Sequence, residues 1–139
     1  LALSMSMVFH PSVKSAIRTV FVKEQRSILS TAKGLFNDAK DSFSFVKIKT
    51  REAIFIEVYR ELDAKTEFVD RIELPKHKDA FFTFNGQTTN LAIDDIDGDQ
   101  SPELLVPTFD SELVAHLSVF KFNASSNRFE PIDPSEINQ

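Results

Sequence analysis

The chain has 139 residues, including 14 Phe, one Tyr and neither Trp nor Cys. This length fits one domain, and the lack of Cys excludes disulfides and cysteine-based zinc sites. A formal net charge of −5, without RNP or helix-turn-helix motifs, argues against a nucleic-acid partner.

Charge divides the chain near residue 41. Residues 1–40 carry six Lys or Arg and two acids, whereas residues 41–139 carry ten and nineteen. We therefore predict an N-terminal apolar segment and amphipathic helix over 1–41, followed by an antiparallel β domain over 42–139. The expected fold class is α+β, with the helix packed on a mainly antiparallel β-sheet or a partial propeller-like β unit.

The first nine residues are apolar, but a membrane-spanning helix needs about 20 such residues. Two interpretations remain open: the end of a membrane anchor that begins before Leu1, or the first element of the core. Pro11 and Ser12 then begin a predicted helix that reaches residue 40, with apolar residues at three- and four-residue steps. The side chains expected to contact the sheet are Ile17, Val20, Ile28 and Leu35.

From Phe43 the apolar period changes to two, which is typical of half-buried strands. Phe43 and Phe45 begin this pattern, and Ile54, Ile56 and Val58 continue it. Turn signals separate the later segments, which predicts antiparallel strands rather than βαβ units. These further strands are expected at about 66–73, 79–84, 88–94, 102–108, 115–122 and 127–132.

Two predicted hairpins, 52–74 and 115–132, resemble each other. Their second strands carry Phe68 and Phe129, which lie 61 residues apart. Such an offset suits the repeat of a four-stranded unit, as in propeller blades. We expect the two Phe side chains at equivalent core positions, with chance similarity of two amphipathic hairpins as the alternative.

An acid-rich loop lies between two predicted strands. Asp95, Asp97, Asp99 and Glu103 occupy relative positions one, three, five and nine, and Ser101 at position seven offers its backbone carbonyl. Ca²⁺ takes six to eight hard oxygen ligands, and neighbouring carboxylates repel one another without a cation. The predicted calcium ligands are therefore Asp95, Asp97, Asp99, Ser101 and Glu103. A solvated acidic turn is the alternative.

This loop departs from an EF-hand, because Gln100 and Val106 stand where that loop has Gly and Glu. Gly98 permits a tight backbone path. Gln100 occupies a position that often needs a left-handed residue, which predicts moderate calcium affinity.

The alternating acids, followed by Pro-Glu-Leu-Leu-Val, resemble the FG-GAP/VCBS repeat family over about residues 90–132. The resemblance implies a short calcium loop before an apolar strand of a propeller blade. It also implies a protein outside the cytoplasm that binds other proteins or carbohydrates. Two such units cannot close a propeller, so an open sheet or sandwich is the other expectation.

The sequence favours a binding or assembly module over an enzyme. His10, His77 and His116 lack metal-ligand spacing, and nucleophile and phosphate-loop motifs are absent. We expect a calcium-stabilised, non-catalytic module that is periplasmic, secreted or on the cell surface, with or without a membrane anchor. Its expected partner is another protein or a glycan. A pilin- or pseudopilin-like subunit and a calcium-dependent hydrolase fragment are the alternatives.

Overall fold

The computed structural model describes residues 25–37, 40–75, 78–133 and 135. This part of the chain contains eleven β-strands and no α-helix, hence no helix that could cross a membrane. The strands are β1 (Ser27–Phe36), β2 (Asp41–Lys49), β3 (Ile54–Glu61), β4 (Thr66–Leu74), β5 (Lys78–Asp79), β6 (Phe82–Phe84), β7 (Gln87–Thr89), β8 (Ala92–Asp94), β9 (Glu103–Phe109), β10 (Ala115–Asn123) and β11 (Arg128–Ile132).

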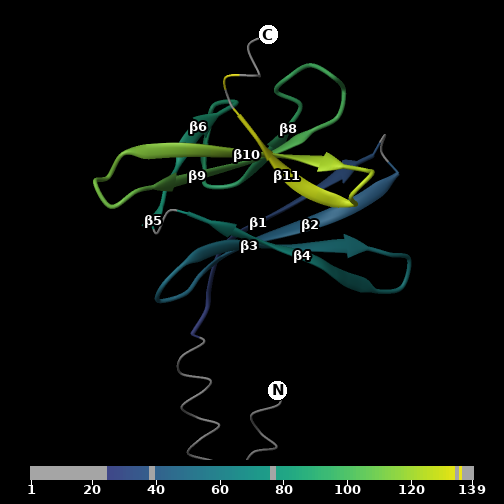
Figure 1. Ribbon diagram of the computed structural model, residues 1–139, viewed down its shortest axis with the longest axis horizontal. Coiled ribbons are helices and arrows are strands. Elements are labelled where there is room, and N and C mark those ends of the chain that lie inside the picture. The colour runs from purple at the N-terminus through teal and green to yellow at the C-terminus, as the bar shows by residue number, and fades with distance from the viewer. Residues whose placement is uncertain (1–24, 38–39, 76–77, 134, 136–139) are drawn as a thin grey trace, which may run out of the picture.

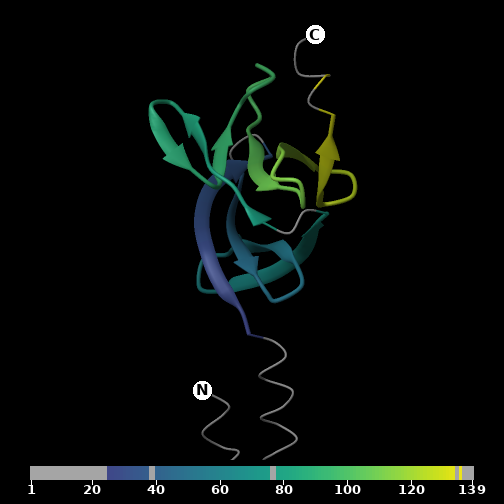
Figure 2. The ribbon, with the colours of Figure 1, turned by 90° about the vertical axis from the view of Figure 1, so that its left-hand side faces the viewer.

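The strands form two antiparallel sheets in layers and a separate hairpin (Figure 1). The first sheet has the strand order β1-β2-β3-β4. The second sheet has the order β11-β10-β9-β5, and β8 also pairs with β9. The hairpin consists of β6 and β7. Figure 2, turned by 90°, shows the second sheet above the curved first sheet. The antiparallel strands predicted beyond residue 42 are thus confirmed, although 79–84 and 88–94 each divide into two short strands.

The predicted N-terminal helix is wrong where the structure describes it, and the α+β fold class is wrong with it. Residues 27–36 form β1, which pairs with β2 along its length. This hairpin crosses the boundary drawn between residues 41 and 42. The earlier part of the predicted helix, with Ile17 and Val20, lies outside the described residues. The pilin-like alternative depended on this helix and is not proposed further.

The inward position of Gly34 explains why the apolar pattern of residues 27–36 resembles that of a helix. Gly34 and Phe36 face the interior, whereas Ile28 and Leu35, the predicted contacts, are 69% and 54% exposed. An added Cβ on Gly34 would lie 3.1 Å from two methyl groups of Ile93, so glycine permits the close approach of β8. A residue without a side chain contributes nothing to an apolar period, and the two-residue alternation of β1 is therefore concealed.

The two hairpins that resemble each other in sequence are not structural copies. Phe129 is 5% exposed, whereas Phe68 is 54% exposed and packs edge-on against Tyr59. Phe68 pairs with Tyr59, but Phe129 pairs with Phe122. A bulge beside Tyr59 shifts the register of β4, and a shift of one residue moves a side chain to the other face. The prediction that the two Phe side chains occupy equivalent core positions is therefore wrong.

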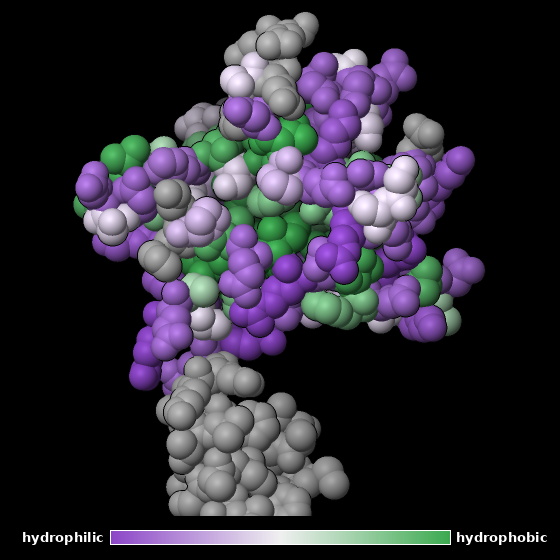
Figure 3. Space-filling model, in the orientation of Figure 1, coloured by the Kyte–Doolittle hydropathy of each residue, from purple (hydrophilic) through white to green (hydrophobic). Residues whose placement is uncertain are grey.

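Aromatic rings from both sheets form the centre of the core. The ring of Phe129 in β11 lies 5.0 Å from those of Phe36 and Phe45 and 5.1 Å from that of Phe43. All three contacts are nearly perpendicular, which is a favoured geometry for aromatic pairs. Hydrophobic residues are visible between the layers in Figure 3, with hydrophilic residues around the margin. Phe129 therefore holds the second sheet against the first.

A buried lysine also joins the sheets. Lys47 follows Phe45 on the inner face of β2 and is fully buried. Its Nζ donates to the carbonyl oxygens of Asn90, at 2.8 Å, and Pro107, at 2.7 Å. Nζ also lies 2.6 Å from Oδ1 of Asp79 in β5. Burial lowers the pKa of Lys47, and the ion pair with Asp79 opposes that shift. One ammonium thus links β2 to three segments of the other layer.

Candidate metal centre

The acid-rich loop connects β8 to β9 on the outer face of the second sheet. Leu104 and Val106 of β9 face the core between the sheets, so Glu103 and Leu105 face the other side. There Leu105 packs with Val119 in a second, smaller hydrophobic cluster. β9 is buried along nearly its whole length, which gives Glu103 a fixed position at the start of the strand.

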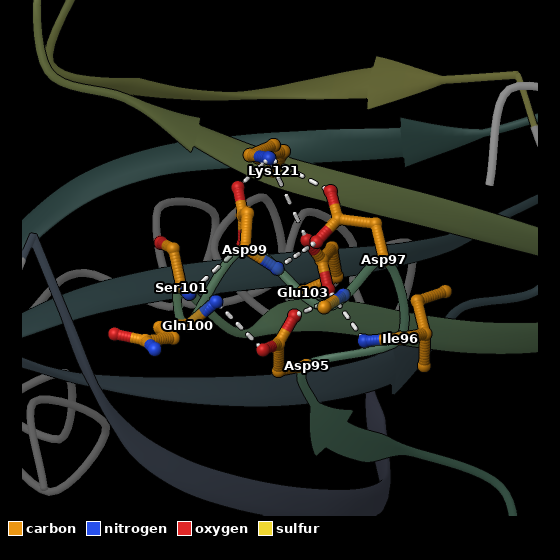
Figure 4. A network of polar contacts seen from close by, with 9 residues as sticks. Asp95, Ile96, Asp97, Asp99, Gln100, Ser101, Glu103 and Lys121 are labelled. Atoms are coloured by element: carbon orange, nitrogen blue, oxygen red, sulfur yellow. Dashed lines mark hydrogen bonds and ion pairs between the residues drawn. The ribbon is translucent and has the colours of Figure 1, made fainter. Parts of the chain in front are cut away.

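The four acids of the loop meet at one place, as the sequence predicted. One carboxylate oxygen from each lies within 4.8 Å of the others (Figure 4). We call Asp95, Asp97, Asp99 and Glu103 the acid cluster. Carboxylates gathered in this way could hold a metal ion.

Backbone N–H groups hold the aspartates in place. The two oxygens of Asp95 accept the N–H groups of Gly98, at 2.9 Å, and Gln100, at 2.7 Å. Oδ1 of Asp97 accepts the N–H of Asp99 at 3.1 Å. Gly98 and Gln100 have φ values of 78° and 70°, which confirms the predicted left-handed position at Gln100. The loop is therefore arranged by its own backbone, and each carboxylate keeps lone pairs for a further partner.

The remaining predicted ligand, Ser101, lies in the same loop. Its backbone N–H donates to Oδ1 of Asp99 at 2.9 Å, and Figure 4 shows the two residues side by side. Ligation through the Ser101 carbonyl stays a prediction. Asp94, the last residue of β8, is exposed and is not part of the acid cluster.

Glu103 is the buried member of the acid cluster, with 0% exposure. Its Oε2 accepts the N–H of Ile96 at 2.9 Å, whereas its Oε1 is buried without a hydrogen-bond partner. Burial is the main cause that raises the pKa of Glu103 to about 7, and the charges of Asp97 and Asp99 add to it. A buried carboxylate oxygen without a donor is costly. The ammonium group of Lys121 forms an ion pair with this orphaned oxygen at 3.8 Å, beyond hydrogen-bond distance, so a cation placed closer could be its partner.

A lysine that the sequence analysis missed lies against the acid cluster. Nζ of Lys121 in β10 is 2.8 Å from Oδ2 of Asp97, forms a second ion pair with Asp99, and lies 3.8 Å from Oε1 of Glu103. The bond from Lys121 lowers the pKa of Asp97, and the two aspartates raise the pKa of Lys121. Strand alternation could have placed Lys121 on an outer face. Its position opposite Glu103 depends on the register of β9 and β10, which no local pattern specifies.

The histidines do not join the acid cluster in the described part of the chain. His116 is a surface residue whose Nε2 lies 2.8 Å from Oδ2 of Asp110. Asp110 also accepts the N–H groups of Glu112 and Val114, so this pair closes the turn between β9 and β10. His10 and His77 lie outside the described residues.

The chain has no significant match among protein-family models, curated proteins or solved structures.

Proposed function

We propose that the acid cluster binds one Ca²⁺ and that the protein is a calcium-stabilised, non-catalytic binding or assembly module. The observation that carries this proposal is the orphaned Oε1 of Glu103, which is fully buried and directed toward three aspartates. A bound cation would give that oxygen a partner and would reduce the repulsion among the four acids.

Calcium suits this arrangement better than magnesium. The ligands proposed are one oxygen from each member of the acid cluster and the carbonyl of Ser101, with water completing the shell. Ca²⁺ accepts six to eight oxygens in flexible geometry, whereas Mg²⁺ demands a near-ideal octahedron and keeps several waters. Asp97 and Asp99 are 22% and 40% exposed, which leaves room for water at the ion.

The ion would fasten the loop between β8 and β9 to the outer face of the second sheet. A ligand that binds only the folded state stabilises it by about 2.7 kcal/mol at 100 times its dissociation constant. Extracellular calcium modules have dissociation constants of about 10⁻⁴–10⁻³ M. The proposed location is therefore outside the cytoplasm, and the proposed partner is another protein or a glycan.

Calorimetry and thermal unfolding test the calcium site. We expect one Ca²⁺ per chain, a higher melting temperature with Ca²⁺ than with chelator, and a much smaller effect of Mg²⁺. Asp97→Asn removes one charged ligand and should weaken binding about tenfold or more. Asp63→Asn, an exposed acid in the turn between β3 and β4, is the matched control and should bind as the wild type does. No heat of binding at millimolar Ca²⁺, with no change in melting temperature, would refute the site.

A further inference from the structure

Lys121 lies in a row of charged residues across the outer face of the second sheet. It pairs with Glu103 of β9 on one side and with Glu130 of β11 on the other. Residues directly opposite each other in antiparallel strands share a face, so all three side chains emerge on the same side. Lys121 therefore has a carboxylate neighbour in each direction.

In this structure the ammonium group of Lys121 is directed toward the acid cluster (Figure 4). It contacts Oδ2 of Asp97 and Oδ2 of Asp99, and it lies 3.8 Å from the orphaned Oε1 of Glu103. A divalent ion bound among these oxygens would be a few ångströms from a positive charge. Two cations at that separation repel, and they would compete for the same lone pairs.

A second carboxylate, that of Glu130, lies beside Lys121 on the adjacent strand. Its side chain is 32% exposed, and it lines a shallow hollow of about 310 Å³ together with Asn123, Glu130 and Ile132. Glu130 is exposed and now accepts hydrogen bonds from neutral groups, the Asn123 amide at 3.0 Å and the Ser126 hydroxyl at 3.0 Å. A long, flexible ammonium side chain could reach the carboxylate on the adjacent strand without a change in the backbone.

We propose that Lys121 is a built-in competitor of calcium: its ammonium group neutralises the acid cluster when no ion is bound, and moves toward Glu130 when Ca²⁺ binds. This inference rests on the proposed calcium function and adds its regulation. The competition lowers calcium affinity and keeps the loop folded without the ion. It also makes the charge in the hollow between β10 and β11 depend on calcium.

Calcium titration of Lys121 variants tests this competition. Lys121→Met keeps the length of the side chain but removes the charge, and it should bind Ca²⁺ at least tenfold more tightly than the wild type. In chelator this variant should melt at a lower temperature, and calcium should raise its melting temperature by more. Lys121→Arg, which keeps the charge, should remain close to the wild-type affinity. Lys65→Met, in the exposed turn between β3 and β4, is the control for loss of one positive charge.

The second position of Lys121 is tested by a double-mutant cycle. Glu130→Gln should weaken calcium binding two- to threefold in the wild type, because it removes the carboxylate that receives the ammonium group. The same substitution should have no effect in Lys121→Met. An equal effect in both backgrounds would refute the movement toward Glu130. Side-chain NMR of the wild type gives an independent measurement, since the Lys121 Cε resonance should shift on addition of Ca²⁺.

The results separate this inference from the proposed function. Equal affinity of wild type and Lys121→Met would refute the competition and leave the calcium site intact. Binding by Lys121→Met alone would refute the calcium function of the wild type and the movement toward Glu130, because the lysine would then occupy the acid cluster in place of the ion. Absence of binding in both proteins would refute both proposals.

Discussion

Removal of the carboxylate beside the buried Lys47 should destabilise the protein strongly. Asp79→Asn keeps the shape of the side chain but takes away the negative charge 2.6 Å from Nζ. Loss of one partner of a buried ion pair costs about 3–5 kcal/mol. Asp79 is 17% exposed, and Lys47 keeps its bonds to the carbonyls of Asn90 and Pro107. We therefore expect a loss of about 2–3 kcal/mol in the free energy of unfolding.

The pH dependence of this loss has a definite sign. Burial already holds the pKa of Lys47 below its usual value of 10.5, and Asp79 is the group that raises it. In Asp79→Asn the pKa should fall further, so the folded state binds fewer protons than the unfolded state over a wider range below 10.5. Stability rises with pH in that range. The difference between variant and wild type should thus shrink from pH 7 to pH 10.

Urea unfolding of both proteins at pH 7 and pH 10 measures this difference. Glu73→Gln is the matched control, because it breaks the exposed ion pair with Arg71, in which Glu73 is 65% exposed. Its cost should not exceed about 0.5 kcal/mol. A cost of Asp79→Asn no larger than that of the control, or one that grows toward pH 10, would refute the reasoning.

Three further substitutions test the core and the loop. Phe129→Ala removes the ring that contacts four others and should cost about 3–5 kcal/mol in urea unfolding; a cost below about 1 kcal/mol would contradict its central place. Gly34→Val should lower the free energy of unfolding by about 1–3 kcal/mol, because the added side chain overpacks against Ile93. Ile93→Ala in the same chain should restore part of this stability, and no restoration would exclude a contact between residues 34 and 93. Gln100→Gly should raise the melting temperature, because glycine adopts a φ of 70° without steric strain; an unchanged melting temperature would show that Gln100 is not strained.

Much of the β domain could be predicted because its strands alternate visibly and its turns carry turn residues. The N-terminal part could not. β1 places Gly34 inward and leaves Ile28 and Leu35 exposed, so its hydrophobic pattern does not report its buried face. The burial of Lys47 could not be predicted either, because a lysine within a strand normally faces outward.

The acid cluster could be predicted because it lies in one continuous loop. Its ligands are set by local spacing, and the positive φ of Gln100 follows from the same local geometry. Lys121 comes from a strand eighteen residues beyond Glu103, and only the pairing of β9 with β10 brings the two together. Long-range pairing of this kind depends on the whole sheet, and a single sequence does not encode it locally.

The most direct test of the calcium site is a crystal structure of the protein grown in millimolar Ca²⁺, with anomalous data collected at long wavelength. We expect one anomalous peak within about 2.3–2.6 Å of oxygens from Asp95, Asp97, Asp99 and Glu103. The ammonium group of Lys121 should have left Asp97 and Asp99. No peak in the acid cluster, with Lys121 still bound to both aspartates, would contradict the account.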